Sequence, residues 1–232
     1  MVGDPRVLRR DKSIALVSGG LDSMVSLARA VLERDVRLVM FFDYGQRARE
    51  SERVSAMSAA NYYGLPFTDV DVRWPESLAP PGMRVSTVPD RRSEPAGALR
   101  ALDEVWIPNR NGVFVNVAAA YAESYSCDTL VTGFNREEAE EFPDNSREYV
   151  ERANRALELS TRNRVRVESF TIDLDKRAII RLGLELKAPL SIVWSCYRSG
   201  ERMCGRCASC ARLRTAIDSL PLSDRPVIEF EA

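Results

Sequence analysis

The fold follows from one stretch near the amino terminus, Ile14-Ala15-Leu16-Val17-Ser18-Gly19-Gly20-Leu21-Asp22-Ser23. An apolar run of strand length comes first, two glycines follow, and an apolar pattern of helical spacing continues to Leu32. Adjacent glycines let the chain turn tightly and place bare N–H groups at the positive end of a helix. The sequence therefore predicts a strand, an anion-binding loop and a helix. The plainer interpretation is a glycine-rich turn with Asp22 as the helix N-cap.

This loop differs from two common phosphate loops. It has neither the lysine of G-x-x-x-x-G-K-[ST] nor the spacing of G-x-G-x-x-G. The pattern S-G-G-x-D-S resembles the pyrophosphate loop of enzymes that cleave ATP between the α and β phosphates. That resemblance implies that the nucleotide contacts lie at Val17, Ser18, Gly19, Gly20, Leu21, Asp22 and Ser23.

Composition fits a globular enzyme with one main domain. The chain has 232 residues, of which 45% are hydrophobic and 29% are charged, so it can bury a sizeable core. Its formal net charge of −1 gives no broad basic field, and we expect no stable binding to nucleic acid. No apolar run reaches the roughly 18 residues of a membrane span. The first six residues contain no apolar secretory core, so the predicted location is the cytoplasm.

Apolar runs alternate with helical patterns along the chain. Strands are predicted at 14–17, 36–42, 67–72, 129–132 and 165–170, and further helices at 47–63, 113–125, 145–161 and 176–186. This order predicts an α/β fold with a doubly wound, mostly parallel sheet. Between 74 and 107 five prolines interrupt the pattern, which indicates a long loop. The predicted division is a main domain at 1–190 and a cysteine segment at 191–232.

Five polar clusters each follow or border an apolar run, at 18–23, 43–47, 108–111, 133–138 and 173–176. Because ligands bind at the carboxyl ends of parallel strands, we expect these clusters to meet on one edge of the sheet. Lys176 is notable in a chain with three lysines and thirty arginines. As a compact charge near a helix start it could hold a departing phosphate, although a solvated helix residue is the plainer interpretation.

The cysteines and the missing histidines restrict the chemistry. A chain without histidine cannot carry a Ser-His-Asp or Cys-His nucleophile. Four of the five cysteines are clustered, and in a reducing cytosol such spacing favours a structural zinc ion held by four thiolates. An iron–sulfur cluster and redox-active thiols are the alternatives. The predicted metal ligands are Cys196, Cys204, Cys207 and Cys210, whereas Cys127 is expected to be a small buried residue.

Several motifs together resemble the 7-cyano-7-deazaguanine synthase family over about residues 14–216. Besides the phosphate loop, they are Phe42-Asp43-Tyr44-Gly45-Gln46-Arg47 with Glu50, Ile107-Pro108-Asn109-Arg110-Asn111, Pro143-Asp144, and Trp194-Ser195-Cys196-Tyr197 followed by the remaining cysteines. The resemblance implies an adenine nucleotide alpha-hydrolase-like fold and an ATP-dependent ligase. Such a ligase converts 7-carboxy-7-deazaguanine and ammonia, by way of the amide, to the nitrile. It also implies Mg²⁺, a bound Zn²⁺ and often a homodimer.

The resemblance also suggests roles for individual residues. The loop would cradle the leaving pyrophosphate, Asp22 would hold Mg²⁺, and Lys176 would neutralise charge. The predicted catalytic residues are thus Ser18, Asp22, Ser23 and Lys176. Further contacts to nucleotide or substrate are predicted at Gln46, Arg47, Asn109, Arg110, Asn111 and Gly133.

Some positions differ from the family pattern. The segment 136–147 is more acidic than in the family, Ala48 stands where histidine is frequent, and Asn109 replaces an alanine. A divergent enzyme could stop at the amide or join the activated acid to another amine, such as a protein amino terminus in an antiphage defence system. Two hypotheses from other classes remain: a zinc-ribbon binding module with an arginine-rich surface, and a tRNA thiolase, which would need a reactive cysteine at the sheet edge.

Overall fold

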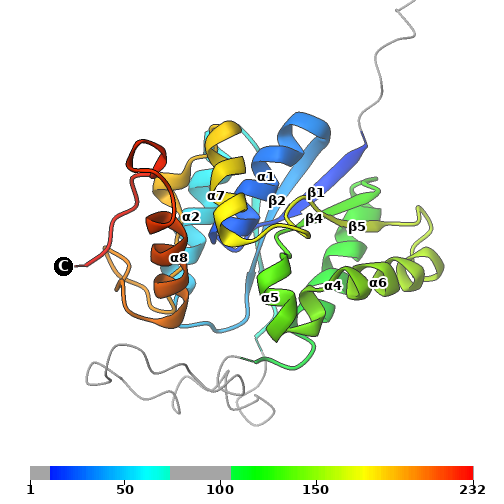
Figure 1. Cartoon of the computed structure of the whole chain (residues 1–232). Helices are drawn as coiled ribbons and strands as arrows, with labels where there is room; N and C mark the ends of the chain where they lie inside the picture. Colours follow the sequence, from blue (N-terminus) through cyan, green and yellow to red (C-terminus); the bar gives the residue numbers. More distant parts are fainter. Residues whose placement is uncertain (1–10, 74–105, 232) are drawn as a thin grey trace, which may run out of the picture.

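The computed structural model describes residues 11–73 and 106–231. The long loop predicted at 74–107 lies outside the described residues except for its last two positions, and so does the segment at 1–6. The five strands are β1 (Lys12–Leu16), β2 (Asp35–Asp43), β3 (Phe67–Asp71), β4 (Thr129–Thr132) and β5 (Arg166–Ser169). They form one parallel sheet in the order β3-β2-β1-β4-β5, which confirms the predicted fold class (Figure 1).

The helices of the described chain cover both faces of this sheet (Figure 1). They are α1 (Leu21–Glu33), α2 (Arg49–Tyr62), α4 (Arg110–Ser124), α5 (Arg136–Glu141), α6 (Arg147–Ser160), α7 (Lys176–Glu185) and α8 (Ala208–Asp218). Short 3-10 turns lie at η2 (Pro143–Asn145), η3 (Leu190–Ile192) and η4 (Leu222–Asp224). One hydrophobic cluster packs α1, α2, α7 and α8 on the sheet, and the other packs α4 and α6.

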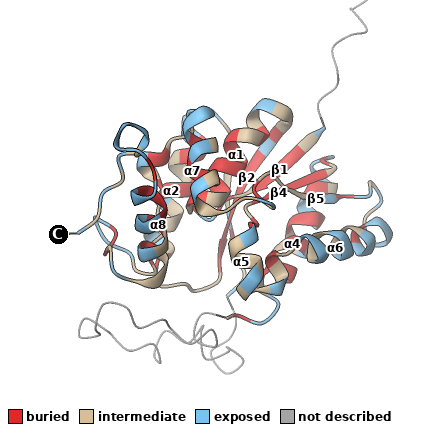
Figure 2. Cartoon of the chain, viewed as in Figure 1, coloured by how far each residue is buried: buried red, intermediate tan, exposed pale blue. Residues whose placement is uncertain are grey.

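Alternation along the central strands explains why both faces are covered. In β1, Ala15 joins the cluster beneath α1 while Ile14 joins the cluster beneath α4. In β2, Phe41 joins the cluster beneath α1 and Met40 joins the cluster beneath α4. All four side chains are at most 1% exposed, as expected for strands buried on both sides (Figure 2).

The order of the strands fixes where a ligand can bind. The chain runs outward from β1 through β2 to β3, and then returns to the other side of β1 as β4. The sheet therefore has its switch point between β1 and β4, and a crevice opens at their carboxyl ends. The phosphate loop follows β1, and Gly133 follows β4.

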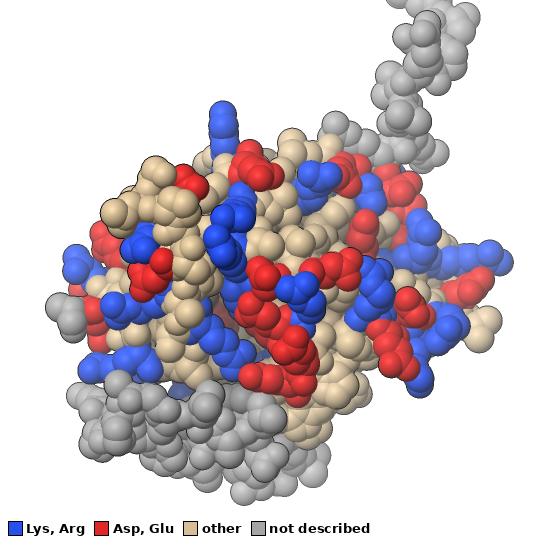
Figure 3. All heavy atoms as spheres, viewed as in Figure 1, with Lys and Arg blue, Asp and Glu red and all other residues tan. Residues whose placement is uncertain are grey.

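Most element boundaries fall close to the predicted ones, with three differences. The helix expected at 113–125 begins at Arg110, and neither α8 nor α5 was expected. The sequence of α5, Arg-Glu-Glu-Ala-Glu-Glu, has no apolar stripe. Asn135 starts α5 by accepting a hydrogen bond from the backbone N–H of Glu138, at 3.0 Å. Acidic side chains consequently gather over α5 on the face shown in Figure 3.

The cysteine segment is joined to the sheet domain through a shared core. Leu213 and Ile217 of α8 belong to the same hydrophobic cluster as Ala15 and Val17. A boundary at residue 190 stays a prediction. Cys127 is fully buried beside the other face of the sheet, as expected of a small filler. Among the helices of the described residues, none has both the length and the apolar character to cross a membrane.

Candidate active site at the carboxyl edge of the sheet

Hydrogen bonds to its two serines fix the conformation of the phosphate loop. The Ser23 hydroxyl accepts a hydrogen bond from the Ser18 backbone N–H at 3.2 Å and donates one to the Gly20 carbonyl at 3.0 Å. The Ser18 hydroxyl in turn accepts from the Gly20 N–H at 3.3 Å. Gly20 is the N-cap residue of α1, and Asp22 lies in the first turn of the helix, so the N-cap interpretation of Asp22 is wrong. The loop therefore surrounds the positive end of α1.

Two glycines allow other elements to approach the loop closely. Gly19 has a φ of +84°, and a Cβ there would lie 2.5 Å from the carbonyl oxygen of Glu52. A Cβ on Gly133 would lie 2.5 Å from the backbone nitrogen of Ser23. The first glycine brings the loop against α2, and the second brings the end of β4 against α1. Only glycine fits at either position without moving backbone atoms.

Lys176, the first residue of α7, points into the edge of the sheet. Its ammonium group lies 2.5 Å from a carboxylate oxygen of Asp22 and 2.8 Å from one of Glu138. Burial alone would lower the pKa of Lys176, but the two carboxylates raise it above its usual range. The helix N-cap, Asp175, places the lysine by accepting from the backbone N–H of Ala178 at 2.8 Å. Lys176 is thus a fixed cation beside the phosphate loop, with only 13% of its side chain exposed.

The Asp22 side chain is only 14% exposed, and one of its two carboxylate oxygens contacts Lys176. Burial raises its pKa to about 6 against the attraction of Lys176, so the carboxylate is ionised at neutral pH. Its Oδ1 atom is buried and has no hydrogen-bond partner among the described residues. A buried carboxylate oxygen without a partner is costly, and a hard divalent cation would satisfy it. The residues present therefore fit the Mg²⁺ ion that was expected here.

A cavity of about 310 Å³ joins these groups to the polar clusters predicted from the sequence. Of the predicted site residues it is lined by Val17, Ser18, Gly20, Leu21, Asp22, Ser23, Gln46, Arg110, Asn111, Gly133 and Lys176. Each of the five predicted clusters contributes at least one of them, so the clusters do meet on one edge. Gly19, Arg47 and Asn109 do not line the cavity.

These three residues have other places in the site. The Gly19 carbonyl accepts hydrogen bonds from the Ser55 hydroxyl and the Trp194 backbone N–H, both at 2.9 Å. The carbonyl of Arg47 accepts from the Ser199 hydroxyl at 3.1 Å. Asn109 is exposed, adopts a left-handed conformation with φ of 56° and lies at the start of α4. Gly19 and Arg47 thus connect their loops to α2 and to the segment around the cysteines.

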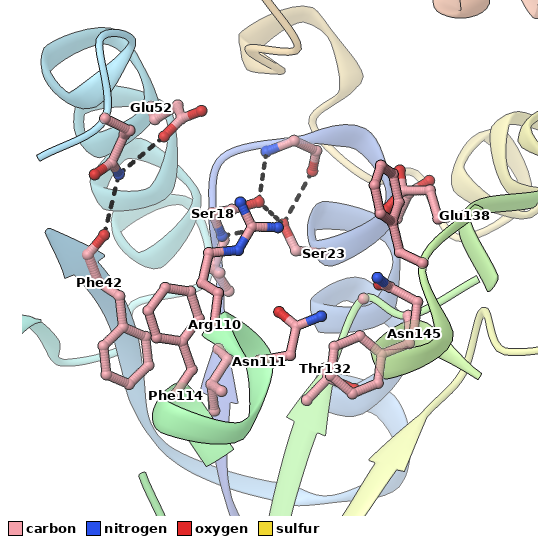
Figure 4. A pocket seen from close by; sticks show the side chains of 18 of the residues that line it. Ser18, Ser23, Phe42, Glu52, Arg110, Asn111, Phe114, Thr132, Glu138 and Asn145 are labelled. Carbon is pink, nitrogen blue, oxygen red and sulfur yellow. Dashed lines mark hydrogen bonds between the residues drawn. The ribbon is translucent and has the colours of Figure 1, made fainter. Parts of the chain in front are cut away.

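Arg110 enters the cavity from the first turn of α4 (Figure 4). Its guanidinium lies 5.3 Å from the centre of the Tyr44 ring and donates a hydrogen bond to the Tyr44 hydroxyl at 3.3 Å. Burial would lower its pKa, but Tyr44, Asp144, Glu138 and Glu52 together raise it. No carboxylate of the described residues lies within 4.0 Å of Arg110. Arg110 is therefore a half-buried cation available to an anionic ligand.

Stacked aromatic rings form part of the cavity wall. Phe42 and Phe114 lie 4.4 Å apart with almost parallel planes, and Tyr44 is tilted against Phe114 at 5.5 Å. Trp106 and Phe142, which also line the cavity, stack at 5.9 Å. A cavity lined by flat apolar rings and cationic side chains suits a planar heterocycle that carries a negative group.

Gln46 holds the loop after β2 in place. Its side-chain oxygen accepts from the Tyr44 N–H at 3.0 Å, and its NH₂ group donates to the Phe42 carbonyl at 3.1 Å and to Glu52 at 3.0 Å. Its amide therefore already makes three contacts within the protein. Asn111 is similarly engaged, because its side chain donates to the Asp144 carbonyl at 3.2 Å.

The four clustered cysteines come together as predicted. Their sulfur atoms all lie within 4.8 Å of one another, and those of Cys204 and Cys210 are 3.9 Å apart. A tetrahedral zinc site with Zn–S bonds of about 2.3 Å has sulfur atoms about 3.8 Å apart. Three of the sulfur atoms are buried and that of Cys207 is half-buried, so an ion held among them would be shielded from water. Thiol spacing and chemistry thus fit a closed zinc site.

Sequence reasoning missed several residues of the cavity. Glu52, Trp106 and Phe142 line it, and so does Arg212 of α8, which pairs with Glu141 at 2.9 Å. None of them belongs to a local motif, since they meet only when distant elements pack. The sequence did hold one signal for α5, the helix that ends directly before Phe142. The spacing of Asn135 and Glu138 is typical of a helix start.

Fold and site together define an α/β protein of the pyrophosphate-loop type, with an anion-binding crevice at the switch point of a parallel sheet. The family model described as queuosine biosynthesis protein QueC matches residues 12–220. The chain belongs to the QueC family. The resemblance inferred from sequence motifs is thereby confirmed, and with it the assignment to a class of enzymes.

Curated relatives match over most of their length. A 7-cyano-7-deazaguanine synthase of Pelotomaculum thermopropionicum is 46% identical over 211 residues, which cover 87% of this chain and 94% of the relative. One of Carboxydothermus hydrogenoformans is also 46% identical, covering 89% and 98%. A third, of Methanosarcina barkeri, is 40% identical, covering 94% and 98%.

Among solved structures, the similarity is more distant. NMN synthetase from Francisella tularensis gives a TM-score of 0.48 at 12% identity, covering 95% of this chain and 88% of that one. A 4-thiouridine synthetase in complex with RNA and ATP gives 0.47 at 17% identity, covering 92% and 52%.

Proposed function

We propose that the protein is an ATP-dependent ligase that adenylates the carboxylate of 7-carboxy-7-deazaguanine and aminates it with ammonia, by way of the amide, to 7-cyano-7-deazaguanine. One observation carries this proposal: a phosphate loop, the cations Lys176 and Arg110, and several aromatic rings line a single cavity. Such a cavity can hold a nucleotide and a planar acid against each other. The names of the curated relatives support the choice of acid and product.

In the first step, a carboxylate oxygen of the acid attacks the α-phosphate of ATP, and pyrophosphate leaves. The backbone N–H groups of the phosphate loop, with Ser18 and Ser23, would hold the β and γ phosphates at the positive end of α1. Lys176 would offset the charge that develops on the leaving pyrophosphate. Arg110 would hold the acid's carboxylate against the α-phosphate, because its guanidinium has no carboxylate partner among the described residues.

In the second step, ammonia attacks the carbonyl carbon of the acyl-adenylate, and AMP leaves with the amide formed. A second adenylation, now of the amide oxygen, releases a second pyrophosphate; loss of AMP with that oxygen and of both protons of the amide nitrogen to water then gives the nitrile. No side-chain nucleophile is needed, which suits a chain without histidine. The role of the protein is to orient the reactants, stabilise charge and exclude water.

Two metal ions belong to this proposal. Asp22 would hold a Mg²⁺ ion that screens the phosphate charge, using the buried Oδ1 atom that has no partner among the described residues. A Zn²⁺ ion held by Cys196, Cys204, Cys207 and Cys210 would fix the C-terminal segment and would take no part in the reaction. Assembly as a homodimer is a further part of the prediction.

The test is to incubate the purified protein with ATP, Mg²⁺, ammonium and 7-carboxy-7-deazaguanine, and to resolve the products by mass spectrometry. Formation of the nitrile with AMP and pyrophosphate is the expected result. Accumulation of the amide, or of adenylate that reacts only when a protein amine is added, would favour the alternative of a divergent enzyme with another acceptor. Absence of AMP release with this acid would overturn the substrate assignment. Asp22→Ala should abolish turnover while zinc content and folding are retained.

A further inference from the structure

One carboxylate of the cavity has no role in the steps above. Glu52, in the first turn of α2, lines the same cavity as the phosphate loop and Arg110 (Figure 4). The cavity must admit the phosphates of ATP and a carboxylic acid, both of which repel a negative side chain. A positively charged or proton-donating ligand would stabilise a carboxylate in such a place.

The other carboxylates that line the cavity in the described part of the chain are already engaged. Asp22 and Glu138 both contact Lys176, at 2.5 and 2.8 Å. The two oxygens of Asp144 accept from the Asn111 backbone N–H and the Asn145 amide, both at 3.4 Å. Glu52 differs from them because no cation lies within 4.0 Å of it among those residues. Its one described hydrogen bond, from Gln46 at 3.0 Å, occupies Oε2.

The surroundings of Glu52 hold the carboxylate in a fixed orientation. Gln46 is anchored to the Phe42 carbonyl and the Tyr44 N–H, so its NH₂ group is aimed at Glu52 and leaves Oε1 for a ligand. Tyr44 and Arg110 are the other titratable groups of the described residues that face this carboxylate. The hydrogen bond from Gln46 and the charge of Arg110 both favour the ionised form.

The proposed amination needs a group of this kind. The nitrogen donor is present in neutral solution almost entirely as ammonium, which has no lone pair and cannot attack a carbonyl carbon. Its proton must be removed, and the chain has no histidine to remove it. Within residues 11–73 and 106–231, four carboxylates line the cavity. Two of them contact Lys176, and both oxygens of Asp144 accept hydrogen bonds. This leaves Glu52 as the candidate base.

We propose that Glu52 binds ammonium in the cavity and removes one of its protons, so that ammonia is formed next to the acyl-adenylate. The proton passes from ammonium to the Glu52 carboxylate; the nitrogen lone pair then forms the C–N bond while the C–O bond to AMP breaks. The added nitrogen loses its second proton to water, and Glu52 returns its own proton to water before the next turnover. This inference rests on the proposed ligase function.

The acidity of Glu52 suits this task. Burial raises its pKa to about 7, although Gln46 and Arg110 oppose the shift. A base whose pKa lies near the working pH is present in both protonation states and can accept and release a proton in each turnover.

The test uses Glu52→Gln, which keeps the shape of the side chain and an oxygen that can accept from Gln46. The control is Glu50→Gln, on the same helix, where the glutamate is exposed and pairs with Arg49. Three rates are measured for each protein: ATP–pyrophosphate exchange with the acid, product formation from ammonium, and hydroxamate formation from hydroxylamine. Hydroxylamine is largely uncharged at neutral pH and needs no base to become a nucleophile.

We expect Glu52→Gln to keep exchange and hydroxamate formation close to wild type and to lose about 100-fold in the ammonium reaction at neutral pH. The loss should shrink as pH rises and free ammonia increases, and Glu50→Gln should behave as wild type throughout. Equal losses in all three rates would mean that Glu52 only supports the site, and no loss in any of them would mean that it does not accept the proton; either result overturns the proposal. If wild-type protein shows no exchange, the ligase function itself fails and the role of Glu52 fails with it.

Discussion

Replacing Gly133 with alanine tests whether the close approach of β4 to α1 shapes the phosphate loop. The added Cβ would lie 2.5 Å from the Ser23 nitrogen, 2.7 Å from its Cα and 2.9 Å from the carbonyl carbon of Asp22. Ordinary contacts between such atoms are about 3.5–4.0 Å, so the start of α1 has to move by about 1 Å. All three atoms are backbone, and no rotamer change can relieve the overlap.

The expected loss of stability follows from other substitutions that add atoms to a well-packed core. Such substitutions lose about 1–3 kcal/mol, and a clash with the backbone should fall at the upper end. For a chain of this size about 3 kcal/mol lowers the melting temperature by about 6–12 °C. A displacement of about 1 Å in the groups that hold the phosphates should also lower the rate of ATP–pyrophosphate exchange by about 100-fold.

The measurements are thermal unfolding and ATP–pyrophosphate exchange on Gly133→Ala. Gly200→Ala serves as the matched control, because the nearest atom to its added Cβ is the Arg202 carbonyl oxygen at 3.5 Å, an ordinary contact. The reasoning is refuted if Gly133→Ala has the melting temperature of the wild-type protein and the same rate of ATP–pyrophosphate exchange. A stability loss with normal exchange would mean that the contact supports the fold without shaping the loop.

Three further predictions follow from the same geometry. Lys176→Met leaves the buried carboxylates of Asp22 and Glu138 unpaired and should cost about 3–5 kcal/mol in urea unfolding at neutral pH. Their folded-state pKa values then rise, so the folded variant binds protons more readily than the unfolded chain, and stability falls as pH rises; a loss equal at acid and neutral pH would contradict this. The exchange rate of wild-type protein should fall as pH drops through about 6, because protonated Asp22 can hold neither Lys176 nor Mg²⁺; a flat profile between pH 5 and 7 would count against that role. Cys204→Ser should lose zinc, measured by elemental analysis, and should melt at a lower temperature, whereas full stability without metal would rule out a structural site.

The central sheet could be predicted because its strands carry their own signal. The runs at 14–17 and 36–42 are buried on both faces, which makes them continuously apolar, and the helices between them have the right length for parallel crossovers. The order of the strands was not predicted, because pairing depends on how crossovers pack and not on any single stretch. The helix α5 was not predicted because it has no buried apolar face. Its acidic residues instead form ion pairs with Lys176 and Arg212, which lie on other helices.

The site divides in the same way. The phosphate loop and the four cysteines are contiguous or nearly so, and their backbone turns and thiol spacing define them before any folding is considered. Arg47 and Asn109 were expected to contact ligand because they lie inside the motifs that resemble the family, yet neither of them lines the cavity. Glu52 carries no motif at all, and its position becomes informative only once Gln46 and Arg110 are seen around it.

The cysteine segment is best understood as part of the site and not as an attached module. The Trp194 backbone N–H, two residues before Cys196, donates to the Gly19 carbonyl, which ties this segment directly to the phosphate loop. Arg212, on the helix that begins directly after Cys207, lines the cavity. A metal ion held by the four thiolates would thus fix both contacts at once. Loss of that ion would then be expected to lower activity through these two contacts, because a closed four-thiolate site offers no open position for chemistry.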